Sequence, residues 1–217
     1  MSIAELDEII EQGCRRLQVG FERNAIGRIA RLSEGLPYYA HLLALHATQR
    51  AVQDDRDTVQ GPDVDWAVGQ AVGKAQQTIQ VAYQRAVQSP RTENQFEQVL
   101  LACALAEKDE SGFFTASAVR APLSAIMDRP REIPTYARHL NQFSQVGRGP
   151  VLRKTGSSRS YFYRFTNPLV QPFVILRGIA AGVASEATIR DLQERAGRSG
   201  GAEPSRATRR ACFEPLG

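Results

Sequence analysis

The sequence has few cysteines, and their spacing excludes two kinds of site. The 217 residues contain three, Cys14, Cys103 and Cys212, and no two of them form a CxxC pair. An odd number of widely separated cysteines predicts neither a disulfide framework nor a cysteine-ligated zinc site. This usage fits a reducing compartment, so we expect a cytoplasmic protein.

Long hydrophobic runs are absent as well. No apolar stretch approaches the roughly 20 residues needed to span a bilayer. The N-terminal segment MSIAELDEII is acidic and amphipathic, which is not the pattern of a signal peptide. We therefore expect no membrane partner. The remaining composition, 42% hydrophobic and 23% charged, is that of an ordinary globular chain.

The sequence also lacks the motifs of catalysis. Among its three histidines, His41 and His46 are five residues apart, so they do not share a ligand face as an HExxH pair does. Gly73-Lys74 is followed by Ala75 inside a helical pattern, so it is not a phosphate-binding P-loop. We expect no catalytic residue, no metal ligand and no cofactor held by this chain alone, and hence no enzyme acting by itself.

What the chain does have is an uneven distribution of charge. Residues 1–110 carry a net charge of −5, whereas residues 111–178 contain ten Lys or Arg against two Asp or Glu. A concentrated basic block is the electrostatic footprint expected of a module that binds nucleic acid, although it also fits a solvated basic surface.

Residues 1–90 have apolar positions at helical spacing. A helix with a capping box at Ser2 ends at Gly20, and a second ends at Gly35. A third begins at Pro37, where the missing N–H of proline is tolerated. The fourth begins at Gly61 and continues to Ala86. Together these patterns predict a small helical bundle.

Two stretches of this bundle carry a family resemblance. IARLSEGLPYYAHLLALHA followed by TVQGPDVDWAV resembles the helical lid of AAA+ ATPases, most closely the origin-recognition type and related bacterial ATPases with a C-terminal winged helix. The Gly-Leu-Pro corner is also similar to the GLPL motif of NB-ARC ATPases. The resemblance implies that Pro37 and Tyr38 face a nucleotide. Tyr38 and Tyr39 stand where many lids have a sensor arginine, so arginine sensing from this helix is not expected.

Residues 91–180 follow a different pattern. It predicts a helix around Phe96–Cys103, a second capped by Thr115 and a third that points Ile133, Tyr136, Ala137, Leu140 and Phe143 inward. Two strand-like runs follow, Val151–Lys154 and SYFYRFT. This order resembles the winged-helix domain that follows AAA+ lids, and RFTNPLVQPFVILR is similar to its closing strand and helix.

A winged helix usually places its third helix in the major groove and its wing on the DNA backbone. In the third helix here, Arg138, Asn141 and Gln142 have base-reading chemistry. The basic residues on the wing and just before it are suited to contacts with DNA phosphates. They are Arg148, Arg153, Lys154 and Arg159. The same module could instead dock on protein, because polar residues on an exposed helix need no ligand.

The expected fold class is therefore mainly α: a lid-like bundle (1–90), a winged-helix domain with a β-hairpin wing (91–180), and a C-terminal helix with a flexible basic tail (181–217). We expect the non-catalytic lid and winged-helix region of an AAA+-type ATPase, coupling nucleotide state to duplex DNA or a protein partner. ATP or ADP would be bound only together with a P-loop domain. The sequence favours a fragment of a longer ATPase over a chain whose P-loop domain is a separate partner.

Two alternatives remain open from the sequence. One is a self-standing winged-helix transcription regulator whose helical half forms a dimerisation or ligand-sensing bundle. The other is an adaptor whose winged helix binds only protein. An oligomer is compatible with each of them.

Overall fold

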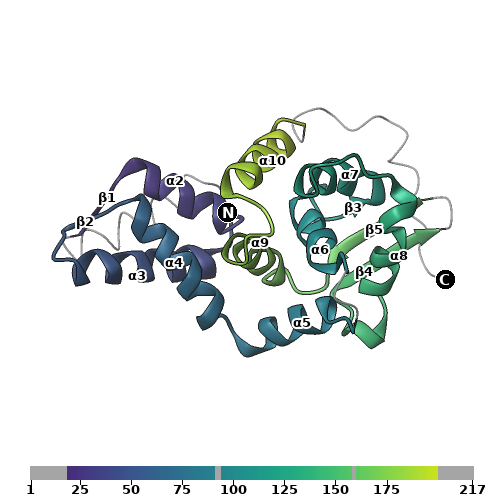
Figure 1. Ribbon diagram of the computed structural model, residues 1–217, viewed down its shortest axis with the longest axis horizontal. Coiled ribbons are helices and arrows are strands. Elements are labelled where there is room, and N and C mark those ends of the chain that lie inside the picture. The colour runs from purple at the N-terminus through teal and green to yellow at the C-terminus, as the bar shows by residue number, and fades with distance from the viewer. Residues whose placement is uncertain (1–18, 91–93, 158–159, 200–217) are drawn as a thin grey trace, which may run out of the picture.

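The computed structural model describes residues 19–90, 94–157 and 160–199, and over these the chain is mainly helical with little sheet (Figure 1). This confirms the predicted fold class at that level. The helix predicted from Ser2 and the tail beyond residue 199 lie outside the described residues. Within the described ranges, no helix combines the length and apolar character needed to cross a membrane.

The N-terminal lobe consists of helices packed beside a short parallel strand pair, β1 (Gly20–Phe21) with β2 (Thr58–Val59). Its helices are α2 (Arg23–Leu32), α3 (Pro37–Gln53), α4 (Gly61–Lys74) and α5 (Gln77–Val87). The predicted starts of α3 at Pro37 and of α4 at Gly61 are confirmed. Helices α2, α3 and α4 face one another with small and branched side chains, which places the lobe's core between them.

The prediction of one helix from Gly61 to Ala86 is wrong. The apolar spacing continues through Ala75, but the backbone there is extended, with φ −57° and ψ 151°. The side chain of Gln80 donates hydrogen bonds to the carbonyl oxygens of Ala75 (2.8 Å) and Gly73 (3.3 Å), which satisfies the end of α4. The chain bends here, so that α5 runs under the molecule toward the C-terminal lobe (Figure 1).

The C-terminal lobe combines three helices with a three-stranded antiparallel sheet of order β3-β5-β4. Its elements in chain order are α6 (Phe96–Leu105), β3 (Phe114–Thr115), α7 (Ala116–Ile126), α8 (Ile133–Phe143), η1 (Val146–Arg148), β4 (Leu152–Ser157) and β5 (Ser160–Phe165). Thr115 caps α7 as predicted, since its hydroxyl accepts from the N–H of Ala118. Strand β3 was not predicted, because two residues carry too little pattern.

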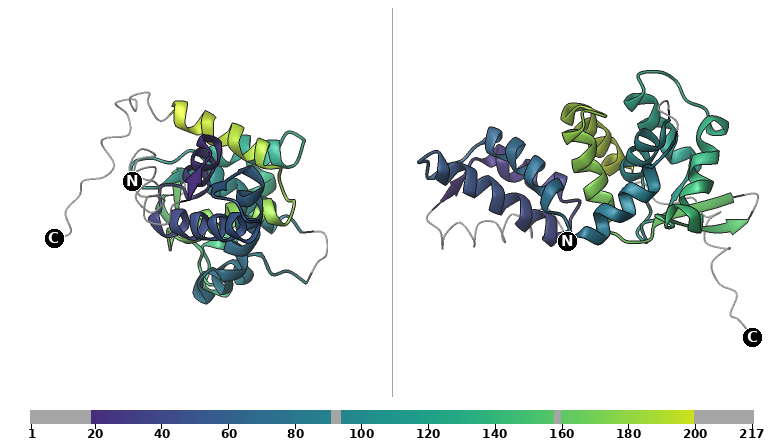
Figure 2. Two further views of the ribbon diagram at one scale, coloured as in Figure 1. Left: turned by 90° about the vertical axis from the view of Figure 1, so that its left-hand side faces the viewer. Right: turned by 60° about the horizontal axis from the view of Figure 1, so that its bottom comes forward.

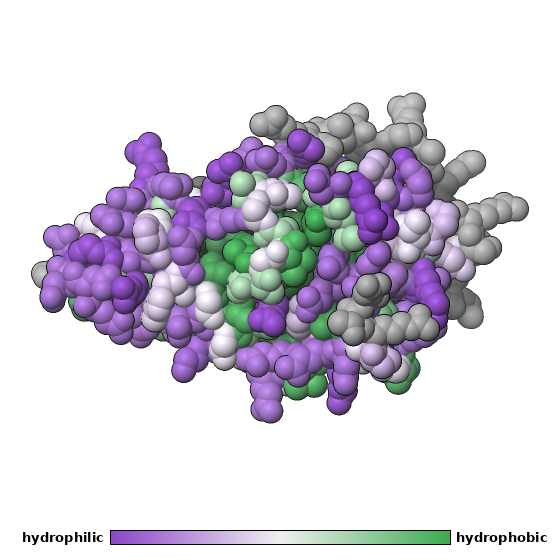
Figure 3. Space-filling model, in the orientation of Figure 1, coloured by the Kyte–Doolittle hydropathy of each residue, from purple (hydrophilic) through white to green (hydrophobic). Residues whose placement is uncertain are grey.

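Helix α9 (Val170–Ala180) joins the two lobes. It packs on α4 and α5 on one side and on α6 on the other, and Figure 2 shows it between the lobes. The rings of Phe173 and Tyr83 meet edge to face at 5.5 Å. A Cβ at Gly178 would come within 2.8 Å of Leu101, so the absence of a side chain allows α9 to approach α6 closely. One buried core therefore runs through both lobes, and hydrophobic residues gather over this middle region in Figure 3.

The last described helix, α10 (Glu186–Ser199), confirms the predicted C-terminal helix. The guanidinium of Arg28 on α2 donates to the carboxylates of Glu186 on α10 (2.6 and 2.8 Å) and Asp65 on α4 (2.5 Å). Three helices far apart in sequence are held together at this point.

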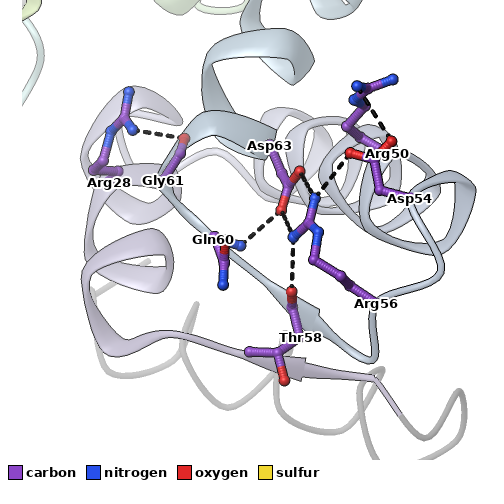
Figure 4. A network of polar contacts seen from close by, with 8 residues as sticks. All are labelled: Arg28, Arg50, Asp54, Arg56, Thr58, Gln60, Gly61 and Asp63. Atoms are coloured by element: carbon purple, nitrogen blue, oxygen red, sulfur yellow. Dashed lines mark hydrogen bonds and ion pairs between the residues drawn. The ribbon is translucent and has the colours of Figure 1, made fainter.

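A second ionic network closes the turn between α3 and α4 (Figure 4). Arg56 donates two hydrogen bonds, of 2.6 and 2.8 Å, to the carboxylate of Asp63, which is 1% exposed. Asp63 also accepts from the backbone N–H of Gln60 in a capping box. The hydrogen bond from Arg56 is the main reason that the pKa of Asp63 lies below its ordinary value.

Candidate nucleic-acid interface and the corner connected to it

Helix α8 is held in place by one face that is buried in the core. Tyr136, Leu140 and Phe143 are fully buried, and the hydroxyl of Tyr136 donates to the carbonyl oxygen of Ala116 at the start of α7 (2.8 Å). The inward orientation predicted for these three residues is confirmed, whereas Ile133, predicted to point inward, is 36% exposed. It is the first residue of α8 and lies beyond the core that the later turns cover.

The exposed side of α8 is linked to strand β4. Lys154 donates a 2.6 Å hydrogen bond to the side-chain oxygen of Asn141, and its ammonium lies 3.5 Å from the centre of the Tyr161 ring. Tyr161 is on β5, so α8 and both hairpin strands meet at this lysine. The structure thus brings together Asn141 and Lys154, two of the predicted DNA-binding residues.

Arg153 is placed differently from Lys154. Successive side chains of a strand point to opposite faces, and Arg153 pairs in register with Arg164 of β5. Arg164 lies over the ring of Phe113, 4.8 Å from its centre, while Arg153 is exposed. The structure therefore places Arg153 on the sheet face away from the Lys154–Asn141 contact. Arg159 lies outside the described residues.

Arg138 and Gln142 lie one turn apart on α8. Arg138 is exposed, Gln142 is half-buried, and both line a hollow beside the start of α6. The described residues offer Arg138 no hydrogen-bond or ion-pair partner.

Arg148, predicted as a phosphate contact, is engaged with the protein. Its guanidinium donates to the carbonyl oxygens of Ala86 (2.6 Å) and Gln88 (2.8 Å) at the end of α5. It also stacks over Phe96, 3.6 Å from the ring centre. These contacts connect the end of α5 to the start of α6, so Arg148 fixes the junction between the lobes. Sequence spacing could not show this, because the partners are about sixty residues away.

The Gly-Leu-Pro corner (35–37) joins α2 to α3 in the N-terminal lobe. Pro37 is exposed at the start of α3, and Tyr38 is half-buried with its ring edge-on to Tyr39 at 5.0 Å. At the entry to the corner, Glu34 and Gly35 have positive φ angles of 50° and 74°. Glycine adopts this conformation freely, whereas for glutamate it carries strain of about 1 kcal/mol or more.

Interactions of Glu34 explain why a strained glutamate is held there. Its carboxylate accepts from the side-chain amides of Gln171 on α9 (2.9 Å) and Gln193 on α10. Lys108, after α6, faces the same small hollow and donates to the carbonyl oxygens of Ala104 (2.7 Å) and Ala106 (2.8 Å). The corner is therefore hydrogen-bonded to two helices of the C-terminal part, α9 and α10, and Lys108 lines the same hollow.

Burial is the largest cause of the pKa shifts of Glu34 and Lys108. It raises the pKa of the Glu34 carboxyl, which the charge of Lys108 opposes together with the two glutamine amides. It lowers the pKa of Lys108 to about 8, although the carboxylate of Glu34 opposes this shift. Neither residue was predicted from the sequence, since a glutamate before a glycine and a lysine after a helix resemble ordinary surface positions.

The corner is also tied to α9 through Tyr39. The phenol of Tyr39, fully buried, donates a 2.8 Å hydrogen bond to the carbonyl oxygen of Leu169, the residue that precedes α9. The residues on either side of Gly35-Leu36-Pro37 thus both bond to the start of α9.

The described residues contain no cluster of His, Cys, Asp and Glu side chains suited to a metal ion. Comparisons with known protein families, with curated proteins and with solved structures found no significant match.

Proposed function

We propose that this chain is the non-catalytic helical lid and winged-helix region of an AAA+-type ATPase, and that it couples nucleotide state to the binding of duplex DNA. A P-loop domain, in the same polypeptide or in a partner, would hold the nucleotide against the Pro37–Tyr38 end of α3. The helix–strand order α6-β3-α7-α8-β4-β5 supports a winged helix with β4–β5 as its wing.

The proposed coupling between nucleotide state and DNA binding is supported by two hydrogen bonds that join the corner to α9. Tyr39 bonds to Leu169, and Glu34 bonds to Gln171. Helix α9 in turn packs on α6, the first helix of the DNA-binding lobe. A displacement of the corner by nucleotide would therefore move α9 and the winged helix with it.

DNA is the favoured partner because of the side chains on α8 and the hairpin. Arg138 and Arg153 are exposed cations, and Lys154 lies between α8 and the wing. Asn141 and Gln142 add groups that can pair with adenine edges. In this arrangement α8 enters the major groove while the wing follows the adjacent backbone.

Fluorescence anisotropy with a labelled duplex, measured over a series of salt concentrations, tests this function. Each phosphate contact contributes about −0.9 to the slope of log K against log salt. The triple variant Arg138→Gln, Arg153→Gln, Lys154→Gln should reduce the magnitude of that slope by about 2, because Arg153 and Lys154 are its phosphate contacts, and should also weaken binding through the loss of base reading by Arg138. Lys74→Gln, an exposed cation at the end of α4, is the matched control and should leave binding unchanged. Equal slopes for the wild type and the triple variant would reject the DNA interface.

One observation favours a second candidate, the self-standing regulator with a dimerisation bundle. Leu45 and Val52, seven residues apart on α3, are 52% and 54% exposed. Apolar side chains at this spacing share a helix face that could pair with a second copy. A stable two-fold dimer at micromolar concentration in light scattering, abolished by Leu45→Glu, would favour this candidate; a monomer would count against it.

A further inference from the structure

A basic hollow lies where the segment after α5 passes beside α8. Its volume is about 490 Å³, and it is lined by the residues before α6, by Phe96, by one side of α8 and by Arg148. A second hollow of about 420 Å³ shares Arg148 and adds Arg85. These volumes lie in the range of about 300–1,000 Å³ that is usual for ligand sites.

The charge of this hollow is uncompensated by the described residues that line it. They include Arg131, Arg138, His139 and Arg148, and none of them is an Asp or Glu. After burial, the charges of Arg138 and Arg148 are what lower the pKa of His139, so the imidazole experiences a positive environment. An anion in the hollow would offset this mutual repulsion.

Several polar side-chain atoms in the hollow also lack hydrogen-bond partners. The Nε and Nη2 atoms of Arg131 and the Nδ1 atom of His139 are buried without a hydrogen-bond partner. Arg148 differs, because its guanidinium is held by two backbone carbonyls and Phe96. Leaving a buried guanidinium without acceptors is unfavourable, and an acceptor supplied by a ligand would remove that penalty.

We propose that this hollow is a binding site for a phosphate group, held by Arg131, Arg138 and His139, with Arg148 as a fixed positive wall. Phosphate oxygens match the planar fork of arginine and provide several acceptors to one cluster of donors. The site goes beyond the proposed function, because it requires neither a P-loop partner nor a nucleotide on the lid. Its phosphate can come from a DNA backbone or from a free phosphate compound.

The structure also predicts how Arg131 behaves without ligand. Since its buried side-chain nitrogens have no partner, Arg131→Gln should leave the melting temperature of the unliganded protein unchanged or slightly higher. A large loss of thermal stability in this variant would show that Arg131 has a structural role and would count against the site.

Titration with inorganic pyrophosphate tests the proposal directly. Calorimetry at low ionic strength should detect binding to the wild type, at least tenfold weaker in Arg131→Gln and in Arg138→Gln. Arg129→Gln is the matched control, because Arg129 is exposed and lines a different hollow. The imidazole resonances of His139 should shift, and its pKa should rise when the anion is bound. No binding, or equal weakening by the Arg129 and Arg131 variants, would overturn the proposal.

Titrating the same variants with duplex DNA identifies the source of the phosphate. If Arg131→Gln weakens the binding of the duplex as well as of pyrophosphate, the hollow takes a backbone phosphate; if it weakens the binding of pyrophosphate alone, the hollow takes a free phosphate compound. Arg153→Gln with Lys154→Gln separates this site from the DNA interface, because neither residue lines the hollow. Loss of DNA binding in that double variant without any pyrophosphate binding to the wild type would leave the proposed function intact and remove the phosphate site.

Discussion

The hydroxyl of Tyr39 donates a 2.8 Å hydrogen bond to the carbonyl oxygen of Leu169, across 130 residues of sequence. This bond joins the second residue after the Gly-Leu-Pro corner's proline to the residue that precedes α9. Burial raises the pKa of the Tyr39 phenol, so the hydroxyl stays protonated and remains a donor. One of the two hydrogen bonds that link the corner to α9 can therefore be removed by a single substitution.

Tyr39→Phe should destabilise the fold by about 1–2 kcal/mol, because it leaves the Leu169 carbonyl without its partner. Urea unfolding measures this change. If the bond transmits movement, amide hydrogen exchange at the start of α9 should also become faster while exchange in α7 does not change.

Tyr38→Phe is the matched control for that prediction. Tyr38 is the neighbouring residue and is half-buried, and no hydrogen bond to its hydroxyl is present among the described residues. Its loss should change stability by less than about 0.5 kcal/mol. Similar effects from the two substitutions would contradict a specific role for the Tyr39–Leu169 bond.

Because of Lys108, the free energy of unfolding should increase with pH in alkaline solution. Its pKa in the folded state is about 8, below the ordinary 10.5, so between these values the unfolded chain binds more protons than the folded one. The free energy of unfolding therefore increases as the pH rises through this window, by up to about 3 kcal/mol.

The difference in unfolding free energy between the wild type and Lys108→Met isolates this contribution, because other groups that titrate cancel. It should grow from pH 8 to pH 10.5 in denaturant titrations. Lys74→Met, at an exposed position, should show no such trend. A difference that does not vary with pH would mean that Lys108 is charged and solvated in the folded protein.

Arg148 is predicted to stabilise the fold through its contacts with α5 and Phe96. Arg148→Gln should lower the free energy of unfolding by about 2 kcal/mol, since it removes charged hydrogen bonds to Ala86 and Gln88 and the contact with Phe96. Arg138→Gln removes the same charge from an exposed site and should have little effect. Thermal unfolding compares them, and equal melting temperatures would refute the structural role.

The contrast between Arg138 and Arg148 shows what the sequence could predict. Local patterns were sufficient for the Thr115 cap and for the burial of Tyr136, Leu140 and Phe143, because these depend on residues three or four positions apart. Contacts formed across the fold left no local pattern. The role of Arg148 depends on carbonyls of α5, and the role of Glu34 depends on amides of α9 and α10.

The break between α4 and α5 was missed for a related reason. Ala71, Ala75 and Ile79 keep the apolar spacing of one helix, and all three are buried. The bend is stabilised instead by polar bonds from Gln80 and by the packing of α5 against α9. Periodicity reports which side of a segment is buried, but not whether its axis changes direction.

Asp63 and its partner Arg56 give the last prediction, which concerns acid stability (Figure 4). The pKa of Asp63 is lowered in the folded state from its ordinary 3.8, so the charged pair contributes stability above that value and loses it as the pH falls through the folded pKa. Asp63→Asn keeps an acceptor for the Gln60 N–H but loses the charge. It should destabilise the protein by about 2 kcal/mol at pH 7, and much less below the folded pKa.

Asp54→Asn is the control within the same network. Asp54 also accepts from Arg56, at 3.2 Å, but its side chain is 37% exposed, and exposed ion pairs contribute little. Denaturant unfolding from pH 7 downward should therefore separate the two variants at pH 7, and the separation should shrink as the pH falls through the folded pKa of Asp63. If Asp54→Asn were as damaging as Asp63→Asn, the turn would depend on the net charge near Arg56 rather than on the buried bidentate pair.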